Sequence, residues 1–240
     1  QTGELGRMTY IRILMPAGDW IANGFSQNIA GNDPKPALER DTPASDMDKD
    51  TNDAYIAFVN YYIHQVNLMR HLLGETWSVN YAARAGVLLA GTSASGIPCS
   101  LEMSPYRTTI DWQEHALVCF EKGWIKLELP APLAINRAGR LEIFRDPEKG
   151  VTPKTEIPQM PWAGAMLQQA RNYVSALQGK IPPMCGAEDA LEDIKLAREY
   201  IRIWKGKYRR SRGVARRRPR AATSAAPTRM QQVQSDVDHA

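Results

Sequence analysis

The segment NYYIHQVNLMRHLLG, residues 60–74, is largely apolar but carries a regular row of polar side chains. Its polar side chains Asn60, His64, Asn67 and His71 recur every three or four residues, so they line up along one side of an α-helix. A helix stripe that faces water normally carries lysine and glutamate, and these positions carry neither. The spacing therefore predicts a helix with a row of amide and imidazole groups on one side.

Apolar residues flank this row, and the chain has no charged residue between positions 54 and 69. A neutral polar row between apolar flanks is typical of the wall of a polar pocket rather than of a wetted surface. We therefore expect the row to line a hollow that could hold a small ligand. The flanks are Tyr55, Val59, Tyr62, Val66, Met69 and Leu73 on one side, and Tyr61, Leu68 and Leu72 on the other.

The helix has expected signals at both ends. Asp53 stands where an N-cap residue is expected, and Gly74 is a typical residue for ending a helix. Residues 16–52, which precede the helix, are crowded with glycine, proline, asparagine and aspartate. They predict a loop of a length that is usually functional or disordered.

Strand patterns surround the helix. Residues 6–15 favour a β-strand, which we expect to end at Pro16. Glu121–Gly123 is a short connection of the kind that joins two strands in a hairpin. Because the runs are joined by short connections, they must pair mostly antiparallel. The further predicted strands are 77–83, 86–91, 115–120, 124–129, 140–146 and 152–157.

Two further helices close the predicted fold. Residues 161–179 begin with proline and end with glycine, as helices often do. Residues 186–204 carry acids in the first turn and bases near the end, which complements the helix dipole. The chain is therefore predicted to be α+β: an open, mostly antiparallel sheet of about six strands with helices packed on one face.

Charge divides the 240 residues into two parts. The whole chain has a formal net charge of +4, but residues 205–240 alone carry +8, which leaves residues 1–204 at −4. We predict a folded domain over 1–204 and a disordered basic tail over 205–240. The tail has Tyr208 as its sole aromatic residue and follows no nucleic-acid recognition fold, so binding of nucleic acid is not expected.

Composition narrows the class of protein further. No apolar run reaches the roughly 20 residues that a membrane span needs, and charges interrupt the first twenty residues, so neither a membrane anchor nor a signal peptide is expected. Cys99, Cys119 and Cys185 show neither metal-ligand spacing nor a disulfide framework. The expectation is a cytoplasmic protein without a metal site.

Four segments carry a resemblance to a known family. They are GELGRMTYIR at 3–12, RHLLGE at 70–75, ALVCFEKGWIKLELP at 116–130 and GAEDALEDIKLAREYI at 186–201. In this order, and with the helix that bears His64, they resemble the C-terminal domain of Gfo/Idh/MocA oxidoreductases over about residues 3–204.

The resemblance implies a two-domain enzyme in its complete form. An N-terminal Rossmann domain would bind NAD or NADP, and the sheet domain would shape the substrate chamber and form a homo-oligomer through its open face. This chain has no Gly-x-Gly-x-x-Gly fingerprint. The cofactor-binding domain is therefore expected from an upstream segment or another polypeptide, and no residue of this chain is assigned to the cofactor.

The resemblance also implies a catalytic role for His64. In the family, a lysine of the Rossmann domain works beside a histidine on this helix, and the pair handles the hydroxyl proton while hydride passes to the nicotinamide. The family motif Asp-x-Gly-x-His-x-x-Asp appears here with Asn60, Tyr62, His64 and Asn67. Both acids are amides, so His64 lacks a helix carboxylate to stabilise its charged form. A role in orienting substrate hydroxyls survives this change more easily.

The predicted substrate-binding residues are Asn60, Tyr61 and Asn67 on the helix, with Asp19 and Trp20 at the mouth of the chamber. Amides suit polyol hydroxyls because they both donate and accept hydrogen bonds. A lone histidine on an apolar helix is also often a hydrogen-bonded core residue, and residues 16–25 could form an ordinary turn.

The sequence is compatible with two functions. In the first, the chain is the substrate-binding and oligomerising domain of an NAD(P)-dependent oxidoreductase that acts on a sugar, polyol or related hydroxy compound. Alternatively, it is a non-catalytic scaffold that associates with itself, or a sugar-binding module.

Overall fold

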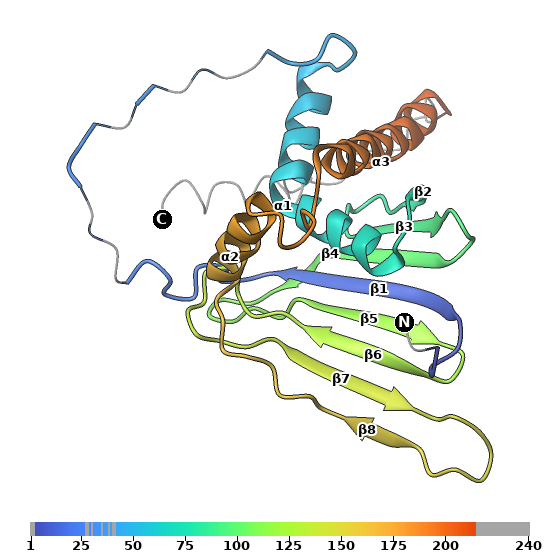
Figure 1. The fold of residues 1–240 in the computed structure, drawn as a ribbon. Helices are drawn as coiled ribbons and strands as arrows, with labels where there is room; N and C mark the ends of the chain where they lie inside the picture. The colour runs from blue at the N-terminus through green and yellow to red at the C-terminus, as the bar shows by residue number, and fades with distance from the viewer. Residues whose placement is uncertain are drawn as a thin grey trace.

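The computed structural model describes residues 3–26, 29, 31–34, 36–37, 39 and 42–214, and side chains as far as residue 206. Three helices and eight strands make up this described part (Figure 1). The strands are β1 (Met8–Ala17), β2 (Trp77–Ala82), β3 (Leu88–Ser93), β4 (Pro98–Arg107), β5 (His115–Phe120), β6 (Gly123–Glu128), β7 (Arg140–Arg145) and β8 (Lys154–Glu156). The helices are α1 (Lys49–Leu73), α2 (Ala165–Leu177) and α3 (Ala187–Val214).

All eight strands form one sheet in the order β2-β3-β4-β1-β5-β6-β7-β8. β1 lies in the interior of the sheet, parallel to β4 and antiparallel to β5, so that Ile13 pairs with Leu101 on one side and Ala116 on the other. The remaining neighbours pair antiparallel. The predicted α+β class with a mostly antiparallel sheet is confirmed, but the sheet has eight strands rather than about six.

Strand β4 was not predicted from the sequence. Pro98 and Pro105 lie within it, and Ser104 takes a positive φ of 46°, so its sequence resembles a loop. Its pairing with β1 is parallel, which is possible because α1 and the β2–β3 hairpin provide the long crossover that parallel strands need. The expected end of β1 at Pro16 is also wrong, since the strand continues to Ala17 through a register shift next to the proline.

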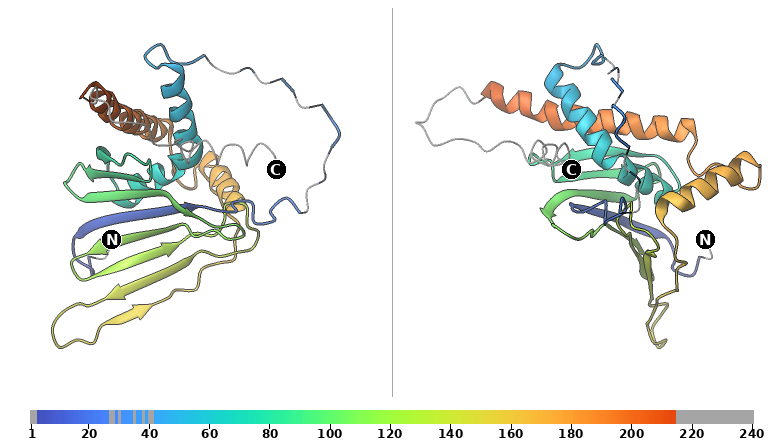
Figure 2. Two further views of the ribbon diagram at one scale, coloured as in Figure 1. Left: turned by 180° about the vertical axis from the view of Figure 1, so that it is seen from behind. Right: turned by 90° about the vertical axis from the view of Figure 1, so that its left-hand side faces the viewer.

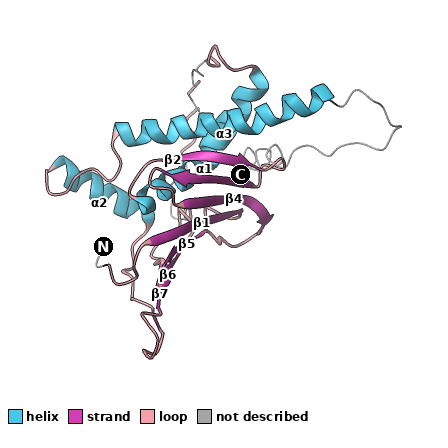
Figure 3. Ribbon diagram, turned by 90° about the vertical axis from the view of Figure 1, so that its right-hand side faces the viewer, coloured by secondary structure: helices cyan, strands magenta, loops and turns pink. Residues whose placement is uncertain are grey.

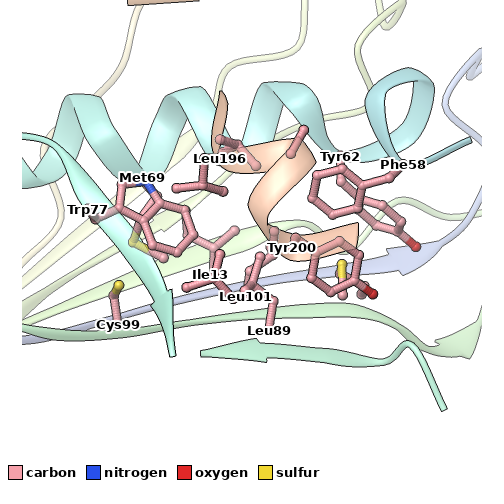
Figure 4. Close-up of a cluster of buried hydrophobic side chains, with 14 of the residues drawn as sticks. Ile13, Phe58, Tyr62, Met69, Trp77, Leu89, Cys99, Leu101, Leu196 and Tyr200 are labelled. Atoms are coloured by element: carbon pink, nitrogen blue, oxygen red, sulfur yellow. The ribbon is translucent and has the colours of Figure 1, made fainter. Parts of the chain in front are cut away.

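Helices α1 and α3 pack against each other on one face of the sheet, above the half that contains β1 to β4 (Figures 1 and 3). Ile11 and Ile13 of β1 and Leu101 of β4 are fully buried beneath them. Phe58 of α1 stacks on Tyr200 of α3 with ring centroids 4.5 Å apart, which joins the two helices above the sheet (Figure 4). The expected packing of helices on one face is therefore present.

The N-terminus of α1 differs from the prediction. The N-cap is Asp48 rather than Asp53, and its Oδ1 accepts a hydrogen bond of 2.8 Å from the backbone N–H of Thr51. Asp53 instead forms an ion pair with Lys49 within the first turns of the helix. The predicted C-terminal signal is confirmed, because Gly74 adopts a left-handed φ of 72° and donates to the carbonyl of Arg70.

The C-terminal helix is longer than expected. α3 runs to Val214, so the predicted boundary at residue 205 falls inside a helix. Lysine and arginine are good helix formers, and a helix that is anchored in the core by Tyr200 and Trp204 can continue through a basic sequence. Residues 215–240, the rest of the predicted tail, lie outside the described residues.

Helix α2 has little contact with the core. α2 has no buried residue, and it stands beside the sheet at one end (Figure 2). Its apolar side chains Met166, Tyr173 and Leu177 are all more than half exposed. Among the described helices, none has the length and hydropathy to cross a membrane.

Candidate functional site

The polar row of α1 lies on the surface of this chain. Asn60, His64 and His71 are exposed, and Asn67 is half-buried. The apolar flank behind the row faces the core, where Tyr62 and the fully buried Val66 pack. The helical alignment is therefore as predicted, but the described chain does not close a hollow over the imidazole of His64.

Asn67 belongs to a hydrogen-bonded network between α1 and the start of α3. Its Nδ2 donates to Oδ2 of the buried Asp193 at 2.7 Å, and also lies 3.3 Å from the sulfur of Cys185. Arg70, one turn farther along α1, donates to Asp193 and to Asp189 at 2.6–3.2 Å. This use of the Asn67 N–H groups fixes the amide in place and leaves its carbonyl oxygen as the group most open to a ligand.

A buried carboxylate lies on the core side of the same helix. Glu114, in the loop before β5, is 6% exposed, and its Oε1 accepts a hydrogen bond of 2.7 Å from Nε2 of Gln65. Its Oε2 accepts a hydrogen bond of 3.1 Å from the indole N–H of Trp112. Burial raises the pKa of Glu114, while these two donors and the positive charge of a protonated His64 oppose the rise.

Glu114 was not predicted to be a site residue. The segment around it has no periodicity, and Gln65 is 49 positions away in the sequence. One signal was available in principle: Gln65 is a polar residue on the core side of an otherwise apolar helix face, and such a residue needs a buried partner.

Tyr62 makes a second polar contact beneath the helix. Its hydroxyl lies 2.7 Å from Oγ of Ser104, at the irregular point of β4 where φ is positive. Burial raises the pKa of the Tyr62 hydroxyl. Tyr61, a predicted substrate-binding residue, is half-buried and packs beside Tyr62 with ring centroids 6.3 Å apart.

Asp19 and Trp20 lie in the turn that follows β1. Oδ1 of Asp19 accepts hydrogen bonds from the backbone N–H groups of Ile21 and Ala22, so the carboxylate organises this turn. The N–H of Asp19 donates to the carbonyl of Asp111 at 3.1 Å, which places the turn against the loop that carries Glu114. Trp20 is 40% exposed. The structure thus brings the predicted loop residues to the segment that contains the buried carboxylate.

A groove with a volume of about 650 Å³ opens elsewhere, between the start of α1, β2 and α3. Its walls include Thr51, Trp77 and the charged side chains Lys195, Arg198 and Glu199. None of the predicted site residues lines it. Arg198 is paired with Asp46, and Glu199 accepts from the backbone N–H of Val79 on the edge strand, so these charges have partners within the fold.

The described residues contain no group of three or more histidine, cysteine or acidic side chains that could hold a metal ion. A dinucleotide-binding turn is likewise not found among them, because the described residues directly after β1 form a turn that leads into no helix by residue 26.

Neither a protein-family model nor a curated protein matches the chain by sequence. Solved structures match it by fold. Levoglucosan dehydrogenase, in its apo form, aligns with a TM-score of 0.54 and 13% identity, over 85% of this chain and 59% of the other. UDP-N-acetylglucosamine 3-dehydrogenase from Acidithiobacillus ferrooxidans aligns with a TM-score of 0.51 and 11% identity, over 84% of this chain and 55% of the other.

A protein from Desulfitobacterium hafniense DCB-2, assigned as an NADPH-dependent oxidoreductase, aligns with a TM-score of 0.55 and 10% identity, over 86% of this chain and 57% of the other. The chain thus spans slightly more than half the length of each of these three structures. At such low identity the likeness concerns the fold alone. The chain shares the fold of one part of proteins described as oxidoreductases and sugar dehydrogenases.

Proposed function

We propose that the chain is the substrate-binding and oligomerising domain of an NAD(P)-dependent oxidoreductase that acts on a sugar, polyol or related hydroxy compound. The observation that supports this most strongly is the fold match to three oxidoreductases and dehydrogenases over more than four-fifths of this chain. The names of these proteins include NADPH dependence and sugar substrates. A cytoplasmic location remains part of the proposal.

The proposed site is the polar row of α1, in which Asn60 and His64 are exposed and Asn67 is half-buried. The imidazole and the Asn60 amide offer donors and acceptors to the hydroxyl groups of a carbohydrate, and the carbonyl oxygen of Asn67 adds an acceptor. His64 would accept the proton of the hydroxyl that is oxidised, as a general base. NAD(P)+, held by a dinucleotide-binding domain, would supply the hydride acceptor, so that the hydroxyl becomes a carbonyl and its proton stays on the imidazole.

A second part must complete this site. His64 and Asn60 are exposed here, and a hydride transfer requires the nicotinamide and the substrate to be held together away from bulk water. A Rossmann domain, supplied by an upstream segment or by another polypeptide, would cover α1 and carry NAD or NADP. The chain's own contribution is to orient the substrate hydroxyls and to receive the proton.

The alternative function is a scaffold that associates with itself. One observation favours it: Trp124 of β6 and Phe144 of β7 stack with centroids 5.7 Å apart, on the opposite side of the sheet from Ile125 and Leu127, which pack toward the core. An aromatic pair on the uncovered face of a sheet fits an interface between two copies. This association is compatible with the enzymatic proposal, which also includes a homo-oligomer.

Titration of the purified chain with NADH separates the domain proposal from a self-sufficient enzyme. We expect no saturable change in NADH fluorescence at micromolar concentrations, because the cofactor domain is elsewhere. Micromolar affinity of the chain for NADH would contradict the proposal that a separate domain binds the cofactor. If the chain forms dimers but binds no carbohydrate, even together with a dinucleotide-binding domain, the scaffold is the better description.

A further inference from the structure

Glu114 is a buried carboxyl group that the proposed reaction does not use. It lies in the loop of residues 108–114, between β4 and β5, and it is 6% exposed. We propose that Glu114 holds a proton in the folded chain and donates it in a hydrogen bond to Oε1 of Gln65 on α1. The resulting acid–amide pair joins the loop to the helix, and it separates more easily once the proton passes to solvent. This inference does not depend on the proposed function.

The amide of Gln65 carries the observation that points to this proton. Gln65 is 4% exposed, and its Nε2 donates to Oε1 of Glu114 at 2.7 Å. The Oε1 atom of Gln65 is also buried, and none of the described residues donates a hydrogen bond to it. A buried acceptor without a donor is unfavourable. A carboxylic acid supplies the donor, because an acid and a primary amide can pair through two hydrogen bonds, O–H to the amide oxygen and N–H to the carboxyl oxygen.

The surroundings of the Glu114 carboxyl favour its neutral form. The indole N–H of Trp112 donates to Oε2 at 3.1 Å, a hydrogen bond that the carboxyl accepts in either protonation state. Within the described part of the chain, no lysine, arginine or histidine forms an ion pair with Glu114. Burial of a carboxylate without a counter-charge is unfavourable, and it raises the pKa of Glu114. The burial and the unpaired amide oxygen therefore point to the same protonation state.

Titratable side chains on the surrounding elements mostly have partners of their own. The acids accept from backbone N–H groups or pair with a lysine, and the histidine of β5 directs its Nδ1 to a backbone carbonyl. These side chains are Asp19 after β1, Asp111 in the loop, Glu128 of β6 and His115 of β5. His64 of α1, when protonated, lowers the pKa of Glu114, but burial is the larger effect, and solvent screens the charge of this exposed histidine.

The acid–amide pair connects more than two side chains. The carbonyl of Glu114 accepts a hydrogen bond of 3.0 Å from the N–H of Leu129 at the end of β6, and the carbonyl of Asp111 accepts one of 3.1 Å from the N–H of Asp19. The loop thus holds the turn after β1 and the end of β6, and the side chain of Glu114 links these segments to α1. An ionised Glu114 no longer donates to Gln65 and places a charge in a buried position. Loss of the proton should therefore loosen the loop from α1.

Infrared spectroscopy of the full chain tests for the proton. The C=O stretch of a protonated carboxyl lies apart from the amide bands, and exposed carboxyls are ionised at about pH 6. At this pH we expect a protonated-carboxyl band in the wild type and none in Glu114→Gln, which mimics the neutral side chain. Glu102→Gln is the matched control and should keep the band, because Glu102 is paired with Arg12 and is 28% exposed.

Gln65→Met tests the partner of the proton. The band should move to higher frequency in this variant, because the carboxyl loses its hydrogen bonds to the amide. The proposal is overturned if the wild type shows no such band at about pH 6, if the band persists in Glu114→Gln, or if it stays in place in Gln65→Met.

Amide hydrogen exchange tests whether the proton controls the loop. The exchange rates of the Asp19 and Leu129 N–H groups are divided by the rates in Glu114→Gln at the same pH, so that the intrinsic pH dependence cancels. Glu114 in an open loop ionises at its ordinary value of 4.5. The ratio should therefore rise above that pH, by up to about tenfold per pH unit, and level off where the infrared band disappears. A constant ratio while the band titrates would show that the loop does not respond to the proton, and it would overturn the proposed connection.

Discussion

Removal of the Arg70 side chain should destabilise the fold far more than removal of a typical ion pair. Arg70 donates one hydrogen bond to Asp189 at 2.6 Å and two to Asp193 at 2.9 and 3.2 Å. The side chain of Asp193 is 4% exposed. Arg70→Met keeps the aliphatic contacts of the helix and leaves the Asp193 carboxylate with Asn67 as its remaining described donor.

The magnitude follows from the burial of Asp193. Removing one partner of a buried ion pair typically costs about 3–5 kcal/mol, a large part of a total stability of about 5–15 kcal/mol. Removing both charges together, in Arg70→Met with Asp193→Leu, should recover most of this loss, because no buried charge is then left unpaired. The matched control is Arg12→Met, whose partner Glu102 is 28% exposed, and it should cost at most about 1 kcal/mol.

Urea unfolding, followed by circular dichroism, gives the free energy of unfolding of each variant. Arg12→Met should be more stable than Arg70→Met, and the double variant should also be more stable than Arg70→Met. If Arg70→Met costs no more than Arg12→Met, the network between α1 and α3 does not hold the two helices together. The hydrogen bond from Asn67 to Asp193 would then not be evidence that the network fixes the Asn67 amide.

Three further outcomes are expected from unfolding measurements. Asp48→Ala should lower the free energy of unfolding by about 1 kcal/mol, because it removes the N-cap of α1, whereas Asp53→Ala should cost less than about 0.5 kcal/mol. Burial raises the pKa of Glu114 above the value of 4.5 in the unfolded chain, so its stabilising contribution is full below that value and is lost as the pH rises through the native pKa. The stability of Glu114→Gln relative to wild type should therefore increase between about pH 4 and pH 7.5, and a constant difference would contradict the raised pKa. Gly123→Ala should cost more than about 1 kcal/mol, because its Cβ would lie 2.0 Å from the carbonyl oxygen of Phe144, and an unchanged midpoint would show that the hairpin can relax.

The parts of the fold that depend on local signals could be predicted from the sequence. The strand predicted over residues 124–129 is present as β6, and Gly74 marked the end of α1. The parts that depend on distant contacts could not. β4 contains two prolines and a positive φ at Ser104, and it is a strand because β1 and β3 pair with both of its edges.

The same division applies to the candidate site. The helical spacing placed Asn60, His64 and Asn67 on one side of α1, but the sequence could not show that this side is exposed in the chain itself. Whether a polar row lines a pocket depends on what packs opposite it, and nothing local to the helix encodes that. Glu114 was missed for a related reason, since its burial results from Gln65 and Trp112 closing over it rather than from any pattern near it.

Nicotinamide turnover by the chain in complex with a dinucleotide-binding domain tests the central claim most directly. The measurement is the rate of NAD(P)H formation with a panel of sugars and polyols, for wild type, His64→Gln and His71→Gln. If the exposed imidazole of α1 receives the substrate proton, His64→Gln lowers kcat by about 100-fold or more, and His71→Gln stays close to wild type. Equal rates for wild type and His64→Gln would contradict the account.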